Sequence, residues 1–202
     1  MRYLDFLAKF KEKQVISIQD IKNTFGKVNY AQLFGWQKKG LLKKVKRGNF
    51  VLADNLVDAH ILANELNYSY ISLEYALSYY QMIPDIAQVI TSVSKDRNEK
   101  IQNIFGNFNY RKITGELFAG FVLLESPILK KRFFRIATLE KAIFDLVYFR
   151  TDLRNENDFK SLRLHLPEKF NIKKVERFAS FVAADQIKKR LDNLIKYLYA
   201  VV

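Results

Sequence analysis

The hydrophobic repeat of this chain changes within its first fifty residues, and the change limits the folds that the N-terminal segment can adopt. From Tyr3 to Trp36 apolar residues recur at the spacing of a helix. From Leu42 to Leu52 they alternate, or nearly alternate, with polar residues, which is the period of a strand. The segment therefore predicts short helices followed by a pair of strands.

Turn and cap residues divide the helical stretch into three helices. The first is expected from Tyr3 to about Lys13. Ser17 is expected to cap the second and Asn29 the third, while Gly40 supplies the left-handed residue that ends the third. The buried side of the third helix is predicted to be formed by Leu33, Phe34 and Trp36.

Positive charge is concentrated in the same segment. The 202 residues contain 34 Lys and Arg against 21 Asp and Glu, a net charge of +13. Residues 1–53 hold twelve of the cations and three of the acids, a net of +9, which leaves +4 for residues 54–202. An excess of this size favours a polyanionic partner, nucleic acid first and an acidic membrane second. From charge alone, a lysine-rich solvated surface explains the excess equally well.

Three helices followed by a hairpin with a basic turn are the pattern of a winged helix-turn-helix, in which the third helix enters the major groove of DNA. The residues predicted to contact DNA are Asn29, Tyr30, Gln32, Gln37 and Lys39 on the third helix and Lys43, Lys44, Lys46 and Arg47 on the hairpin. Each of them is also explained as an ordinary exposed polar residue. The main alternative for the whole segment is a winged helix that contacts only proteins.

The remaining residues predict a mixed α/β domain with a helical C-terminal end. Helices are expected over 58–66, from the cap Ser72 to a point before Pro84, from the cap Thr138 onward, and along two apolar stripes of the last third. Strands are expected over 89–93, 100–104, 108–113, 117–124 and 132–136, with Gly106-Asn107 as a hairpin turn. The fold class is therefore predicted as α+β. The two domains are predicted as residues 1–54 and 55–202, packed closely, with a boundary near Ala53–Leu56.

No catalytic motif is recognisable. The chain has no cysteine, which excludes a disulfide framework and cysteine chemistry, and its two histidines, His60 and His165, lie far apart. Glu140, Lys141 and Asp145 invite a catalytic reading, but Lys141 and Asp145 have the i,i+4 spacing of a structural ion pair. The chain is therefore predicted to be no enzyme and to need no cofactor or metal. A nuclease that uses Asp85 or Asp158 is the less favoured alternative.

A second anion-binding surface in the larger domain is the less favoured interpretation of two further basic clusters. Its candidate residues are Lys130, Lys131, Arg132 and Arg135, and a further cluster is formed by Lys188, Lys189 and Arg190. Solvated surface charge is the favoured explanation of both clusters. No apolar run approaches the ~20 residues of a membrane span, and no signal peptide is recognisable, so a soluble, cytoplasmic protein without a membrane partner is expected.

Two longer blocks resemble the AbiEi-type antitoxin family. They are Tyr70-Ile-Ser-Leu-Glu-Tyr-Ala-Leu-Ser-Tyr-Tyr-Gln-Met-Ile-Pro84 and Ile136-Ala-Thr-Leu-Glu-Lys-Ala-Ile-Phe-Asp-Leu-Val-Tyr148. The hairpin is similar too, as Gly40-Leu-Leu42 and Arg47-Gly-Asn-Phe50. The chain departs from the family at Leu139, where a proline is usual, and around Gln81.

The resemblance implies a two-domain bacterial antitoxin that belongs to abortive infection. In such proteins a winged helix represses its own operon by binding inverted repeats in the promoter, and the C-terminal domain counteracts a nucleotidyltransferase-like toxin without a stable complex. The expected function is accordingly a DNA-binding antitoxin and autorepressor. A module that neutralises a partner protein directly, without binding DNA, is the alternative.

Overall fold

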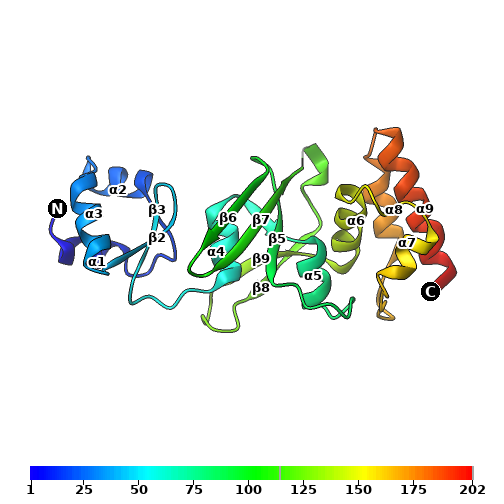
Figure 1. Ribbon diagram of the computed structural model, residues 1–202, viewed down its shortest axis with the longest axis horizontal. Coiled ribbons are helices and arrows are strands. Elements are labelled where there is room, and N and C mark those ends of the chain that lie inside the picture. Colours follow the sequence, from blue (N-terminus) through cyan, green and yellow to red (C-terminus); the bar gives the residue numbers. More distant parts are fainter. Residues whose placement is uncertain (114, 202) are drawn as a thin grey trace.

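A computed structural model describes residues 1–113 and 115–201. Within these ranges the chain forms nine α-helices, a short 3-10 helix and nine strands, which confirms the predicted α+β class. Along the long axis of the molecule, the N-terminal residues form one end, a mixed sheet the middle and a group of helices the other end (Figure 1).

The N-terminal part, residues 1–53, combines three helices with a small antiparallel sheet. Its elements are α1 (Tyr3–Phe10), β1 (Ile16–Ser17), α2 (Ile18–Phe25), α3 (Tyr30–Lys38), β2 (Leu42–Lys46) and β3 (Asn49–Leu52), and the strand order is β1-β3-β2. The predicted caps are confirmed: the Ser17 side chain accepts from the backbone N–H of Asp20, and that of Asn29 from the N–H of Gln32. Gly40 has a φ of +71°, as the end of α3 requires.

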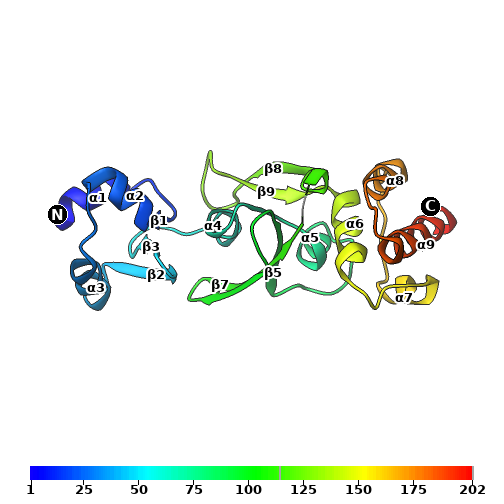
Figure 2. The same ribbon diagram turned by 90° about the horizontal axis from the view of Figure 1, so that it is seen from above.

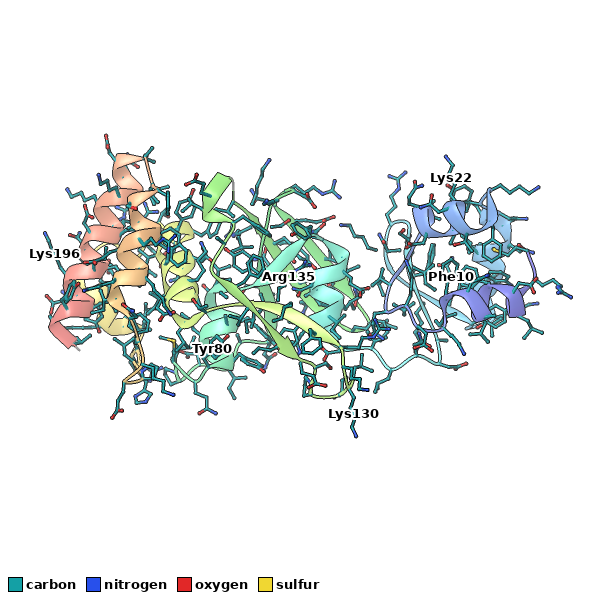
Figure 3. All side chains as sticks on the ribbon, turned by 180° about the vertical axis from the view of Figure 1, so that it is seen from behind. Phe10, Lys22, Tyr80, Lys130, Arg135 and Lys196 are labelled. Carbon is teal, nitrogen blue, oxygen red and sulfur yellow. The ribbon has the colours of Figure 1, made fainter. Side chains whose placement is uncertain are left out.

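An aromatic core holds these elements together. The ring of Phe6 lies 4.8 Å from that of Phe10 and 5.0 Å from that of Trp36, so α1 and α3 pack on each other directly. Phe10 lies inside this part in Figure 3, whereas Lys22 of α2 points away from it. The prediction that Phe34 belongs to the buried side was wrong, because its side chain is 58% exposed. At helical spacing Phe34 cannot share the inward face with both Leu33 and Trp36.

A six-stranded mixed sheet forms the middle of the molecule. Its strands are β4 (Ser69–Ile71), β5 (Val89–Ser94), β6 (Glu99–Asn103), β7 (Gly106–Lys112), β8 (Phe121–Glu125) and β9 (Phe133–Ala137), in the order β6-β7-β5-β4-β9-β8. The pairs β5–β7 and β4–β9 are parallel and the others antiparallel. The two edges are therefore β6 and β8, and β6 lies toward the N-terminal part.

The remaining helices cover the sheet and extend the core away from it. They are α4 (Ala59–Leu66), α5 (Leu73–Tyr79), α6 (Leu139–Phe149), α7 (Glu156–Ser161), α8 (Ile172–Ser180) and α9 (Asp185–Val201). Helix α6 lies between the sheet side of the molecule and the C-terminal helices (Figure 2). Because it packs on α5 at one side and on α8 and α9 at the other, it is buried along most of its length.

Two predicted elements differ in their bounds. The β6–β7 turn consists of Ile104 and Phe105 rather than Gly106-Asn107, because the side chain of Asn103 accepts from the N–H of Phe105 at 2.8 Å and closes the turn earlier. The strand expected over 117–124 begins only at Phe121. Gly115–Leu117 form a 3-10 helix, and Gly120, with a φ of +78°, turns the chain into β8.

The connection between the two parts is fastened by side chains. Asn55 donates to the carbonyl oxygens of Lys11 and Lys13, both at 3.1 Å, in the segment after α1, which ends at Phe10 and not at the predicted Lys13. Gln14 donates to the carbonyl oxygen of Leu56 at 3.0 Å and accepts from the N–H of Asp58 at 3.3 Å. The predicted boundary near residues 53–56 stays a prediction. Three valines from the N-terminal part pack in the core of the larger part: Val15, Val45 and Val51.

Candidate nucleic-acid interface

The stretch from Ile21 to Ala53 contains no acidic residue and eight basic ones. The basic residues are Lys22, Lys27, Lys38, Lys39, Lys43, Lys44, Lys46 and Arg47. The three acids of residues 1–53 all precede it, and two of them are paired: Asp5 with Arg2 and Asp20 with Lys13. The stretch includes α3 and the β2–β3 hairpin, so these elements carry positive charge that no acid of their own segment offsets.

The outward face of α3 is open and aromatic. Tyr30 is 66% and Phe34 58% exposed, and the ammonium group of Lys38 lies 4.7 Å from the centre of the Phe34 ring. These three residues are four apart, so they lie on one face of the helix. Asn29 and Lys39 are exposed at its two ends. The face therefore offers two aromatic rings and one cation between polar ends.

The two glutamines predicted to read bases are not on this open face. Gln32 is half-buried, and its Oε1 is buried without a hydrogen-bond partner among the described residues. Gln37 is half-buried too and donates to the carbonyl oxygen of Leu33 at 3.2 Å, within its own helix. Of the predicted α3 residues, Asn29, Tyr30 and Lys39 are exposed. Phe34 and Lys38 were not among the predicted residues, although their i,i+4 spacing from Tyr30 and from each other indicates the same helix face.

The hairpin exposes only part of its predicted basic set. Lys44 and Arg47 are exposed, and the tip is held near α2 because the N–H of Ile18 donates to the carbonyl oxygen of Gly48 at 2.9 Å. Lys43 is half-buried and donates to the carbonyl oxygen of Ala53 at 3.2 Å. The exposed pair Lys44 and Arg47 is therefore the part of the hairpin that can reach a phosphate.

Lys46 was predicted to contact DNA, and the structure turns it inward instead. Its ammonium group donates to Oε2 of Glu99 at 2.7 Å, to Oδ1 of Asn67 at 3.0 Å and to the carbonyl oxygen of Leu66 at 3.2 Å. Burial alone would raise the pKa of Glu99, but the hydrogen bonds from Lys46 and Asn67 outweigh it and lower that pKa. Lys46 thus joins the hairpin to the larger part.

The four residues of the predicted second anion surface do not form one surface. Lys130 and Lys131 are exposed on the β8–β9 loop, and Lys130 points away from the body of the molecule in Figure 3. Arg132 donates instead to the carbonyl oxygen of Glu12 in the N-terminal part. Arg135 donates to the carbonyl oxygen of Ser69 at 2.9 Å and lies over a tyrosine ring. Both arginines serve contacts within the chain.

The two blocks that resemble the antitoxin family meet in the core of the larger part. Tyr70 and Ser72 donate to Oδ2 of Asp145 at 2.9 and 2.7 Å, and Lys141 donates to Oδ1 at 2.7 Å. The predicted Lys141–Asp145 ion pair is confirmed, and both side chains are fully buried. Burial lowers the pKa of Lys141 and raises that of Asp145, and their mutual attraction opposes both shifts. The network joins β4 to α6 and has no contact with solvent.

A second polar cluster, which the sequence did not predict, lies at the start of α4. His60 Nδ1 is 3.0 Å from Oδ1 of Asp58, His60 Nε2 is 2.9 Å from the hydroxyl of Tyr75, and the hydroxyl of Ser126 donates to Asp58. Asp58 and His60 are close in sequence, but nothing in the sequence brings Tyr75 and Ser126 to them. Because Ser126 is bonded to the carboxylate and not to the imidazole, the cluster lacks the nucleophile–base contact of a hydrolase.

The described residues form neither a metal site nor a membrane-crossing helix. Among residues 1–113 and 115–201, no three His, Cys, Asp or Glu side chains are grouped so that they could hold a metal ion. In the same ranges, no helix combines the length and the apolar character that crossing a bilayer requires. A comparison with models of protein families gives no match, and neither does a comparison with curated proteins.

Proposed function

We propose that this chain is a DNA-binding regulator whose N-terminal part acts as a winged helix-turn-helix on duplex DNA. The observation that carries the proposal is the acid-free stretch from Ile21 to Ala53, which contains an exposed helix and an exposed basic hairpin tip. Duplex DNA carries a dense row of phosphates, and basic residues that neutralise them release counterions and gain affinity.

In the proposed complex, α3 lies in the major groove, which is about 12 Å wide and accepts a helix. Tyr30 and Phe34 can contact thymine methyl groups, and the amide of Asn29 can pair with a base edge. Lys38 and Lys39 lie at the C-terminal end of the same helix, within reach of the backbone. Lys44 and Arg47 contact phosphates from the hairpin and carry no sequence information themselves.

We further propose that the regulator is an antitoxin that represses its own operon and counters a nucleotidyltransferase-like toxin. Support for this role comes from the two sequence blocks, Tyr70–Pro84 and Ile136–Tyr148. Both blocks contribute to one buried hydrogen-bond network through Asp145. A buried network needs all its members, so the two blocks are expected to occur together in one family. Growth rescue in cells that express the neighbouring gene product tests this role separately from DNA binding.

A protein-binding module that contacts its partner directly is the second candidate function, and the β8 edge of the sheet favours it. Leu123 is 63% exposed on this edge strand, and the neighbouring strand exposes 54% of Phe133. Exposed apolar residues at an unpaired edge are a common docking surface for other chains. This candidate predicts co-purification with a partner protein and no affinity for DNA.

The DNA proposal is tested by fluorescence anisotropy with a labelled duplex taken from the region upstream of the gene. We expect saturable binding that weakens steeply with salt. The double change Lys44→Ala and Arg47→Ala removes two phosphate contacts. It should lower affinity for all duplexes and reduce the slope of log K against log salt by about 2.

The matched control is the double change Lys130→Ala and Lys131→Ala, which removes the same charge from an exposed loop outside the N-terminal part. It should leave the salt slope unchanged. Absence of saturable binding to the upstream duplex at ~50 mM salt would overturn the proposal. An equal loss in the control would show that only net charge matters, and would overturn the assignment of the hairpin.

A further inference from the structure

A cavity in the C-terminal helical end is lined by cations and polar side chains. It has a volume of about 520 Å³ and lies beside α9 and the chain that follows α6. Its lining residues are Thr151, Arg154, Gln186, Lys189, Arg190 and Asn193. Besides the three basic residues, the lining contains a hydroxyl and two amides, and all of these groups can donate hydrogen bonds. The lining contains no carboxylate.

Backbone carbonyls hold the two guanidinium groups of the cavity in place. Arg190 donates from Nη2 to the carbonyl oxygen of Tyr148 at 3.0 Å, and Arg154 donates from Nε to that of Thr151 at 2.6 Å. The amide of Asn193 donates to the carbonyl oxygen of Arg154 at 2.9 Å. Among the described residues, Nη1 of Arg190 and both terminal nitrogens of Arg154 have no partner. Arg190 is half-buried and bonded to two backbone carbonyls, whereas Arg154 is exposed and bonded to one, and both keep unused donors.

The acids nearest these cations are bonded to other groups, although the charge of Arg154 still helps to lower the pKa of Asp152. Asp152 is paired with Arg150, and Asp158 accepts from the backbone N–H groups of Arg154 and Asn155 at the start of α7. Within residues 1–113 and 115–201, the ion pairs shorter than 4.0 Å involve none of the three cavity cations. Burial lowers the pKa of Arg190, and the positive charge of Arg154 lowers it further.

A structural role explains only one of the three cations. Arg190 caps the C-terminal end of α6, where a cation is favourable because the helix dipole is negative there. The same reason does not apply to Arg154, which bonds within its own turn, or to Lys189, which makes no hydrogen bond among the described residues. Arg154 and Lys189 are exposed, so solvent screens part of the repulsion between the three cations, and an anion bound between them would lower it further.

We propose that this cavity binds the phosphate group of a small phosphorylated ligand. Arginine forks and an ammonium group around a hollow match the charge and the several acceptor oxygens of a phosphate. The volume is within the range of small-molecule sites. Duplex DNA is the less suitable ligand, because its phosphates follow a convex surface and need cations in a row. The inference does not depend on DNA binding by α3.

Isothermal titration of the full chain, at constant ionic strength and without divalent metal, tests the proposal. The probes are inorganic phosphate, ATP and a short DNA duplex, with adenosine as the counterpart that lacks phosphate. We expect saturable binding of at least one phosphate-bearing probe and none of adenosine alone. The variant Arg154→Gln with Lys189→Gln should weaken that binding about tenfold or more, since each change removes charge-assisted hydrogen bonds.

The control variant, Lys173→Gln with Lys188→Gln, makes the same change in charge on exposed residues of α8 and α9 that do not line the cavity. It should keep the affinity of the wild type, and thermal unfolding should show that both variants are folded. Tighter binding of ATP than of phosphate identifies a nucleotide as the source of the phosphate group, and equal binding identifies free phosphate. Absence of saturable binding, or an equal loss in both variants, overturns the proposal. It is also overturned if only duplex DNA binds and the cavity variant weakens that binding.

Discussion

At the scale of single residues, buried charge is the feature that most affects stability. Lys141 and Asp145 are both removed from solvent, and each depends on the other and on the hydroxyl groups of Tyr70 and Ser72. Removing water from two ions is costly, and a buried pair balances this cost only while its geometry and its hydrogen bonds are complete.

The change Asp145→Ala should destabilise the protein by about 3–5 kcal/mol, because it leaves a buried ammonium group without a partner. Urea unfolding followed by circular dichroism measures this loss. Glu156 and Lys160 form a matched pair at the same i,i+4 spacing in an exposed helix. The change Glu156→Ala should leave the unfolding midpoint nearly unchanged. Similar effects of the two changes would contradict the importance assigned to burial.

Asp58 makes the fold less stable as the pH falls into the acid range. Burial alone would raise its pKa, but hydrogen bonds from the His60 side chain, Ser126 and the His60 backbone outweigh it and lower the pKa to about 2. A carboxylate whose pKa is lower in the folded state stabilises the fold above its unfolded pKa, about 3.9, and this stabilisation is lost as pH falls toward 2.

The change Asp58→Asn should therefore cost on the order of 2 kcal/mol at neutral pH and flatten the dependence of stability on pH between 4 and 2. Unfolding by urea at a series of pH values measures both effects. The exposed neighbour Asp54 supplies the control, and Asp54→Asn should keep the wild-type dependence. A wild-type slope retained in Asp58→Asn would assign the acid sensitivity to another group.

At the scale of elements, the sequence predicted contacts between residues close in the chain but not contacts between distant ones. The caps Ser17, Asn29 and Thr138 were predicted correctly because each bonds an N–H only three residues away. The predicted cap Ser72 was wrong, because its hydroxyl donates to the distant Asp145 instead. The roles of Lys46, Arg132 and Arg135 were missed because their partners lie 20 to 120 residues away in the chain. For the same reason helices and strands were largely predicted, whereas the division of basic residues between surface and interior was not.

Gly120 is an element boundary that no sequence pattern revealed. Its φ is +78°, and a Cβ atom at this position would collide with the ring of Phe178 and press against the side chain of Lys141. The glycine thus lets β8 begin directly beside α6 and α8.

The change Gly120→Ala should lower the unfolding midpoint far more than Gly26→Ala. Gly26 has nearly the same φ, +76°, but open space around its missing Cβ. The Gly26 variant should lose only the backbone strain of about 1–2 kcal/mol from its free energy of unfolding. The Gly120 variant should lose roughly 1–3 kcal/mol more through overpacking. Thermal unfolding of both variants is the measurement. Equal losses would show that α8 moves aside without cost.

At the scale of the whole molecule, polar contacts hold the N-terminal part against the sheet. Lys46 contacts Glu99, and the amide of Asn103 donates to the carbonyl oxygen of Val45 at 3.0 Å, so the hairpin covers the β6 edge. The opposite edge, β8, has no such cover among the described residues, which is why its apolar residues are exposed. The sequence could not distinguish these edges, because strand order depends on pairings between distant segments.

The change Lys46→Ala should destabilise the junction by about 1–3 kcal/mol, since it leaves Glu99 and Asn67 with unsatisfied groups. Hydrogen exchange of the β2 and β6 amides should accelerate together, and DNA affinity should fall only through this loosening, without a change in salt slope. Lys44→Ala, on the same strand but exposed, should show the reverse pattern. A reduced salt slope in the Lys46 variant would contradict its inward placement.

The fastened connection at Asn55 has a consequence for the geometry of any complex. Because side-chain hydrogen bonds of Asn55 and Gln14 cross it, the connection between the two parts is rigid and not a flexible linker. When α3 binds a duplex, the larger part would then lie at one fixed angle to the DNA axis. Two molecules on neighbouring half-sites would face each other or point apart according to the helical phasing of the sites, about 10.5 base pairs per turn.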